Sequence, residues 1–406
     1  FLVDTEYKYW TGIYHFLKKE LKVKSVVSGT QLGYSPPFVQ ARLDYIDNHS
    51  YWCHPGPVNP NWRIRNESMV NSMACIRNLA SQRIDGKPYT ISEYNHPFPN
   101  LYGAEGQPML RAYGRLQGWD GVFEYTYNHR SDFSPNHINY FFSMIARTDV
   151  LGHFPACAAM YLRGDVREAK SAVAIPLGYE EYFDRLVSKK AIGAGVDVKG
   201  VDQRYALLHQ TTVQLKEGDA ASGGFDKKIP DNQKVFVSDT KELTWNIEKQ
   251  DSGYFTVNTP NTKLFTGFPA GRFIQLGNVG VSIGKTRLDW ATLSFVSRNA
   301  AGFGEKGLPS SILLCATGLV ENKGMVIKQV SGKQITLSNW GGEKMLAEGI
   351  PATIILPSDP LKTKCFALGP DGKRLKEVPV EKAGKGKAQI TISPLYQTIW
   401  YEIEIR

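Results

Sequence analysis

A carboxylate ends a short apolar run in the first quarter of this 406-residue chain. The run 88–92 leads into Glu93, and Asn95, His96 and Pro97 follow at once. In a parallel βα barrel, side chains at the carboxyl ends of the strands face the active site. Glu93 is therefore well placed for chemistry, although a strand-end Glu can also be a solvated loop residue.

A second apolar run, 45–52, carries His49, Tyr51 and Trp52. His49 and Tyr51 are two residues apart, so they point to the same side of a strand. A Tyr hydroxyl beside a carboxylate favours its charged form through a hydrogen bond. We therefore expect Tyr51 to orient Glu93 and keep it ionised, and Trp52 to stack on a sugar ring. A His–Tyr pair in the core is the structural alternative.

A third segment, 117–129, combines one carboxylate with several aromatic residues. Glu124 lies inside a strand-like run, and Tyr125, Tyr127 and His129 share one face of it because side chains alternate along a strand. These side chains, with Trp119, are candidate platforms for sugar rings. Glu124 is a candidate acid/base, and a buried ion pair is the alternative interpretation.

The elements that would position these residues alternate along the first 165 residues. Strands are predicted at 24–30, 45–52, 88–93 and 121–127, and helices at 7–21, 67–82, 107–117, 138–147 and 156–162. Strands that alternate with helices predict βα units and a parallel sheet. A (β/α)8 barrel has eight strands, so this region has the size of half a barrel.

The predicted secondary-structure pattern of the chain changes after residue 165. Residues 166–234 are mixed, with a predicted helix at 202–212 and a Gly-, Ser- and Asp-rich loop at 218–224. From residue 235 onward, turns separate short strands, among them 254–258, 280–283, 312–316, 353–356 and 388–392. This pattern predicts antiparallel β-sandwich layers. We therefore divide the chain into 1–165 and 166–406, with a possible further boundary near residue 345.

Composition argues against several other classes of protein. The net charge of +9 would admit a nucleic-acid partner, but Lys and Arg are scattered, and the densest stretch, 382–387, is a Gly-rich hairpin loop. Five widely spaced cysteines without a CxxC pattern argue against a disulfide framework or a zinc ribbon. His49, Cys53, His54 and His96 fit no usual zinc spacing, so we expect neither metal nor cofactor. The apolar runs are too short for a membrane span, and no signal peptide is visible at Phe1.

Taken together, these segments resemble glycoside hydrolase clan A, in particular family-5-like cellulases. Ile91-Ser92-Glu93 resembles the end of barrel strand seven, and His49-Ser50-Tyr51 the end of strand six. Trp119 to Tyr127 resembles strand eight, and residues 1–31 resemble the helix before strand five and that strand. The resemblance covers residues 1–165 and implies barrel strands five to eight. The remainder resembles the accessory sandwich domains that follow such barrels.

The resemblance implies an endoglucanase-like enzyme that cleaves β-linked plant polysaccharides with retention, with Glu93 as the nucleophile. It also implies His49 and Tyr51 beside the nucleophile, and Trp52, His96, Trp119, Tyr125, Tyr127 and His129 around the substrate. Retention needs a second carboxylate about 5–5.5 Å from the first. In the clan this acid/base follows an Asn at the end of strand four, but the chain carries only Asn66-Glu67, at a predicted helix start. Glu124, Asp47, Glu105, Glu6 or a second subunit remain as candidates.

Half a barrel leaves strand edges and an apolar face uncovered, which predicts a homo-oligomer. The expected partner is an oligo- or polysaccharide, with no nucleic acid and no membrane. The resemblance implies a secreted or periplasmic setting. Two alternatives stay open: a degenerate carbohydrate-binding protein that has lost catalysis, and a truncated enzyme fragment.

Overall fold

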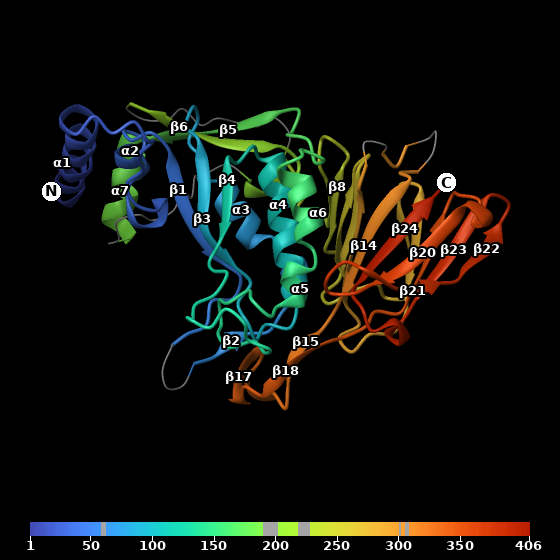
Figure 1. The fold of residues 1–406 in the computed structure, drawn as a ribbon. Helices are drawn as coiled ribbons and strands as arrows, with labels where there is room; N and C mark the ends of the chain where they lie inside the picture. The colour runs from blue at the N-terminus through green and yellow to red at the C-terminus, as the bar shows by residue number, and fades with distance from the viewer. Residues whose placement is uncertain (58–61, 190–201, 218–227, 300–301, 305–307) are drawn as a thin grey trace.

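The computed structural model describes residues 1–57, 62–189, 202–217, 228–299, 302–304 and 308–406 (Figure 1). Parallel βα units come first, and large antiparallel β-sheets follow them along the chain. No closed barrel forms among these residues. The predicted combination of α/β and all-β architecture is therefore confirmed at this coarse level. The loop predicted at 218–224 lies outside the described residues.

Three parallel strands carry the candidate residues. They are β1 (Ile46–Tyr51), β3 (Tyr89–Asn95) and β4 (Gly121–Glu124), in the order β1-β3-β4. The pairing register of β1 and β3 shifts after Asn48, so that His49 lies opposite Glu93. Because the strands are parallel, their carboxyl ends share one edge of the sheet, where the predicted site residues meet.

Three of the predicted helices form in this part of the chain, each shorter than or close to its predicted length. The range 67–82 contains a 3₁₀ turn (Met69–Asn71) and α3 (Ala74–Ala80), while α4 (Gly106–Leu116) and α6 (Phe154–Tyr161) match the other two. Nearly every residue of α4 is buried, because it packs on the sheet and on α6. A short helix, α5 (Thr148–Leu151), precedes α6.

The prediction of a strand at 24–30 is wrong, because this segment pairs with no other strand in a β-sheet. It lies as coil beside Asp44, whose backbone N–H donates to the Val27 carbonyl and whose carboxylate accepts from the Val27 N–H, both at 2.9 Å. The helix before it forms as α1 (Leu2–His15), continued by a π-helical turn (Phe16–Glu20). It has no buried residue and lies at one end of the molecule, near α2 (Pro37–Gln40) and α7 (Tyr179–Lys189) (Figure 1).

Two further predicted helices are corrected. Residues 138–147 form turns whose backbone pairs with distant loops: Phe98 N–H donates to Phe141, and Thr126 N–H to Phe142, at 2.8 and 2.9 Å. Within 202–212 only a 3₁₀ turn (Gln203–Leu207) is helical. The chain then enters β6 (Gln210–Lys216), which runs parallel to β5 (Ala172–Gly178). Another 3₁₀ turn, at Leu32–Tyr34, lies much earlier in the chain, before α2.

One hydrophobic core continues across residue 165. Val166, Val173 and Leu207 belong to the same buried cluster as Ile91 and Leu110 of the parallel sheet and its helix. The β5–β6 pair therefore packs as part of the α/β region.

Two antiparallel sheets share a second core, as the strand pattern predicted. Leu293 and Leu314 of the larger sheet and Val281 and Ile354 of the smaller sheet are buried in one cluster. The larger sheet contains, in order, β21 (Arg374–Val378), β20 (Thr363–Leu368), β24 (Trp400–Ile405), β14 (Ser311–Thr317), β13 (Ala291–Ser297), β10 (Thr262–Gly267), β9 (Tyr254–Asn258), β8 (Leu243–Asn246) and β7 (Val235–Val237). The smaller contains β11 (Phe273–Leu276), β12 (Val279–Ile283), β19 (Ala352–Leu356), β23 (Lys387–Ile392) and β22 (Val380–Gly384).

The large sheet also packs against the α/β region. The buried Trp245 of β8 donates from Nε1 to the Val70 carbonyl at 2.9 Å. The buried His153, just before α6, contacts Ser294 of β13 and Thr317 of β14, each at 2.8 Å. The two parts are thus joined by buried polar contacts as well as by apolar packing.

Residues 320–347 form an arm that returns to the parallel sheet. It contains β15 (Val320–Lys323) paired with β18 (Gly342–Ala347), and β16 (Val326–Ser331) paired with β17 (Gln334–Asn339). Strand β17 also pairs with β2 (Ile64–Arg65) in the loop after β1. Residue 345, near which a boundary was predicted, lies in β18, shortly before the chain enters the smaller sheet.

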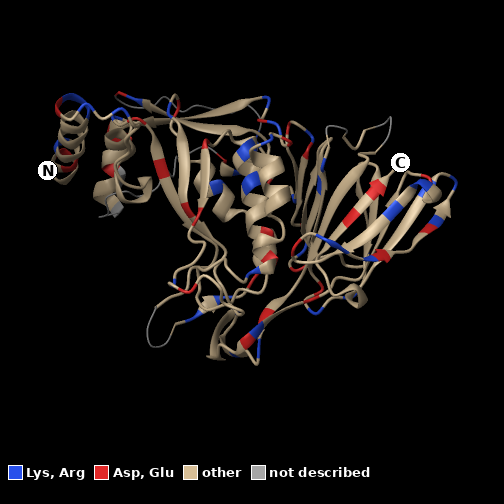
Figure 2. Cartoon of the chain, in the orientation of Figure 1, with Lys and Arg blue, Asp and Glu red and all other residues tan. Residues whose placement is uncertain are grey.

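Charge is spread over the whole molecule. Figure 2 shows Lys and Arg on helices, strands and loops of both parts. Among the described residues, no helix is long and apolar enough to cross a membrane.

Candidate functional site

The structure brings Glu93, Tyr51 and His49 together at the carboxyl ends of β1 and β3. The Tyr51 hydroxyl donates a hydrogen bond to Oε2 of Glu93 at 2.5 Å. Nδ1 of His49 lies 3.3 Å from the same oxygen. One third of the Glu93 side chain is exposed (33%), so the carboxylate is both held in place and open to a ligand.

Burial and the neighbouring Glu93 carboxylate keep the Tyr51 phenol protonated. Burial raises the pKa of Tyr51 well above its usual value, and the hydrogen bond to Glu93 raises it further. Tyr51 is therefore a hydrogen-bond donor to Glu93 throughout the neutral pH range.

Asp47 lies close to His49, and its hydrogen bonds could not be inferred from the spacing of residues in the sequence. Asp47 accepts hydrogen bonds from the hydroxyls of Thr90 and Ser92, both at 2.5 Å, and from the Ser92 N–H at 3.1 Å. Nε2 of His49 lies 2.9 Å from the Ser92 hydroxyl oxygen. Burial acts to raise the pKa of Asp47, but the hydrogen bonds from His49, Ser92 and Thr90 together lower it.

Aromatic side chains form a wall beside Glu93. The Tyr125 ring lies 6.4 Å from the Tyr51 ring and 5.9 Å from His129, which stacks on Tyr140 at 4.3 Å. Phe142 contacts both Tyr51 and Tyr125, at 5.3 and 5.8 Å. This wall offers flat apolar faces of the kind that stack on sugar rings.

Tyr127, which was predicted to bind substrate, and His54, which was not, are both exposed. The predicted Tyr127 is 53% exposed. The exposed His54 packs edge-on against Tyr51 at 5.1 Å and was not among the predicted ligand-binding residues. The aromatic run 140–142 was also missed, because the segment was predicted to be a helix.

Trp52, Trp119 and His96 were predicted to contact substrate, but the structure places all three in the core. Trp52 donates from Nε1 to the Glu67 carbonyl at 2.9 Å. The Trp119 ring packs edge-on against a buried tyrosine, and His96 is fully buried with Nε2 3.2 Å from Asn100. None of the three offers a face to a ligand in this structure.

Glu124 lies in a buried ion pair, the alternative that the sequence left open. Arg111 donates from Nη1 to Oε1 at 2.5 Å, and the Gln107 amide donates to Oε2. Burial raises the pKa of Glu124, while Arg111 and Gln107 act to lower it. Both oxygens are engaged with donors from α4.

The other candidate carboxylates also accept hydrogen bonds from neighbouring groups of the protein. Glu105 is fully buried and accepts hydrogen bonds from the Ser68 hydroxyl and the Met69 N–H; burial raises its pKa to about 8. Glu6 lies on α1 and accepts from Nε1 of Trp10 at 3.2 Å. Asp47 is bound as described above, so none of the four candidates has a free carboxylate beside Glu93.

The described residues contain no group of three or more His, Cys, Asp or Glu that could hold a metal ion. The five cysteines are all free thiols. The groups that meet at this site are a carboxylate, a phenol and an imidazole.

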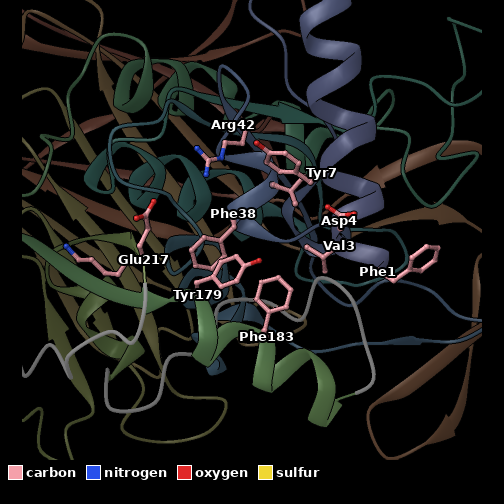
Figure 3. A pocket seen from close by; sticks show the side chains of 11 residues that line it. Phe1, Val3, Asp4, Tyr7, Phe38, Arg42, Tyr179, Phe183 and Glu217 are labelled. Carbon is pink, nitrogen blue, oxygen red and sulfur yellow. The ribbon is translucent and has the colours of Figure 1, made fainter.

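A separate cavity of about 540 Å³ lies between α1, α2, α7 and the end of β6. Figure 3 shows Phe38, Tyr179 and Phe183 gathered on one side of it and Arg42 on another. Phe38 and Tyr179 pack at 5.3 Å. The cavity shares no lining residue with the Glu93 site.

Comparison with known proteins adds no family. No protein-family model matches the chain, and no curated protein matches it. The function must therefore be argued from the site.

Proposed function

We propose that this protein is a retaining glycoside hydrolase that cleaves β-linked plant polysaccharides in the manner of an endoglucanase, with Glu93 as the nucleophile. The observation that carries the proposal is the 2.5 Å hydrogen bond from the Tyr51 hydroxyl to a one-third exposed Glu93 carboxylate at a parallel strand end. A retaining mechanism needs an ionised carboxylate aimed at the anomeric carbon, and a fixed donor orients it.

The finer resemblance to a barrel is part of the same proposal. In it, β1, β3 and β4 correspond to strands six, seven and eight of a (β/α)8 barrel. Tyr125, His129 and Tyr140 then form the wall on which a sugar stacks. The segment 24–30, expected as strand five, is coil, so three of the four expected strands support this correspondence.

The acid/base in this proposal comes from a second copy of the chain. Glu124, the candidate on β4, is bound to Arg111 and Gln107, which leaves the site one carboxylate short. The exposed α1 and the π-helical turn after it present Leu2, Tyr9 and Phe16 to solvent, an apolar surface suited to a partner. Light scattering should show an oligomer, and a monomer that remains active would contradict this step.

The test is hydrolysis of carboxymethyl-cellulose, xylan and aryl β-glycosides by the parent, Glu93→Gln and Glu343→Gln. Glu343 is a matched control because its side chain is 75% exposed and far along the chain, in β18. We expect activity in the parent and the control and none in Glu93→Gln. Full activity in Glu93→Gln would refute the assignment of the nucleophile.

A carbohydrate-binding protein without catalysis is the second candidate. It is favoured by one observation, the engagement of Glu124 by its two neighbours, which removes the candidate acid/base on β4. It predicts glycan binding in both the parent and Glu93→Gln, and hydrolysis in neither. Either candidate would suit a secreted or periplasmic protein, which we propose as its setting.

A further inference from the structure

The hydrogen bonds around Asp47 and His49 fix where their protons lie. Asp47 accepts from Thr90, from the Ser92 N–H and from the Ser92 hydroxyl, which approaches Oδ2 at 2.5 Å. An ionised carboxylate has no proton to give, and a serine hydroxyl has one. The single proton of Ser92 therefore points to Asp47.

It follows that the Ser92 oxygen is an acceptor toward His49. The contact between Nε2 of His49 and this oxygen is 2.9 Å long, so the proton in it must come from Nε2. Oδ2 of Asp47 lies only 3.5 Å from Nε2 and favours a proton there as well.

The second ring nitrogen faces the candidate nucleophile. Nδ1 lies 3.3 Å from Oε2 of Glu93, the oxygen that also accepts from Tyr51. A bare lone pair on Nδ1 would be repelled by an ionised carboxylate, whereas a proton on Nδ1 would be attracted to it. Asp47 on β1 and Glu93 on β3 thus flank the ring with two negative charges.

We propose that Asp47 and Ser92 are positioning residues that hold a proton on Nε2 of His49, so that His49 stands beside Glu93 as an imidazolium with Nδ1–H directed at the nucleophile. The catalytic meaning of this arrangement rests on the proposed function: a cation beside Glu93 stabilises the ionised form that attacks a sugar. The proton arrangement itself does not depend on that function.

Nuclear magnetic resonance of the full chain labelled with ¹⁵N-histidine tests the proposal at neutral pH. The His49 ring signals are identified by their loss in His49→Gln. We expect both ring nitrogens of His49 to be protonated in the parent and in Asp231→Asn, a control at an exposed carboxylate (82%). In Asp47→Asn we expect one ring proton to be lost.

Ser92→Ala, which removes only a hydroxyl, is the second variant in case Asp47→Asn does not fold. This substitution removes the Ser92 hydroxyl oxygen, the acceptor closest to Nε2, so we expect a smaller fraction of His49 to be doubly protonated. A parent with one ring proton, or spectra unchanged in both variants, would overturn the proposal. These spectra need no turnover, so a parent without hydrolytic activity would contradict the proposed function and not this inference.

Discussion

Glu93, Tyr51 and His49 form a site because two strand ends lie side by side in a fixed register. Their proximity was predictable in part from the sequence, since the two-residue spacing of His49 and Tyr51 aims both at one side of β1. The same rule explains the error at Trp52. It adjoins Tyr51, so its side chain points to the opposite face, into the core.

Asp47 could not be assigned from the sequence. Its partners Thr90 and Ser92 are more than 40 positions away, and only the register of β1 against β3 brings them together. Such contacts depend on which strands become neighbours, which spacing within one segment does not reveal.

Removing the Tyr51 hydroxyl should slow catalysis without unfolding the protein. A hydrogen bond to a charged group contributes about 1.5–3 kcal/mol, so Tyr51→Phe should lower kcat/KM about 10- to 100-fold. Tyr34→Phe is the control, because the Tyr34 side chain is 70% exposed and forms no part of the site. Steady-state kinetics on an aryl glycoside checks this, and equal rates in both variants would count against a role for Tyr51.

At the scale of elements, one side chain joins β3 to the segments that carry the aromatic wall. The buried Asn95 amide donates to the carbonyls of Tyr125 and Phe142, at 2.5 and 2.7 Å. The wall therefore depends on an irregular segment that tertiary hydrogen bonds hold in place. Its apolar periodicity resembled that of a helix, and for this reason the prediction for 138–147 failed.

Asn95→Ala should destabilise the protein by about 1–3 kcal/mol, because it leaves two buried carbonyls without their donor. Asn78→Ala, on the exposed side of α3, should change stability by no more than about 0.5 kcal/mol. Urea unfolding measures both. Similar midpoints for the two variants would show that the Asn95 contacts do not hold the wall.

Glu105 should make stability depend on pH. Burial raises its pKa in the folded protein to about 8, from an ordinary value of 4.5. The folded state thus favours the protonated acid, so this contribution is fully present below pH 4.5 and is lost as pH rises toward 8.

The comparison of parent with Glu105→Gln isolates that effect, because Gln stays neutral. Relative to the variant, the parent should lose up to about 1.4 kcal/mol per pH unit between pH 5 and 8. Urea midpoints at several pH values give the difference. A difference that stays constant with pH would contradict the buried, protonated state.

At the scale of the whole molecule, the turn-separated strands after residue 235 predicted the antiparallel sheets well. Strands β11 and β23 alternate buried and less buried positions, and β10 and β13 are buried on both faces. The parallel pair β5–β6 was missed, since its strand 210–216 follows a helical turn and pairs with a distant segment. The pairing of the arm 320–347 with β2 could not be predicted either, because it joins segments that are far apart in the sequence.

The contact of His153 with β13 and β14 should make the joint between the two parts sensitive to acid. Burial lowers the pKa of His153 to about 3, so its neutral ring is favoured in the folded protein. Its contribution is present above pH 6.5 and is lost as pH falls toward 3. Relative to His153→Gln, the parent should therefore lose stability on acidification, by up to about 1.4 kcal/mol per pH unit.

Urea unfolding between pH 6.5 and 4 measures this difference, with the exchange of an exposed histidine, His15→Gln, as the control. The control should follow the parent at every pH. Parallel curves for the parent and His153→Gln would contradict a neutral, buried His153 at the joint.

The most direct test of the central claim is to trap the sugar on Glu93. Aryl β-glycosides with fluorine in place of the hydroxyl next to the anomeric carbon, and with a dinitrophenolate leaving group, need no acid to depart. Incubation with gluco-, xylo- and manno-configured reagents, followed by peptide mass spectrometry, should show one glycosyl group on the peptide containing Glu93. Glu93→Gln should remain unlabelled. Labelling of another carboxylate, or none with any reagent, would contradict a retaining mechanism at Glu93.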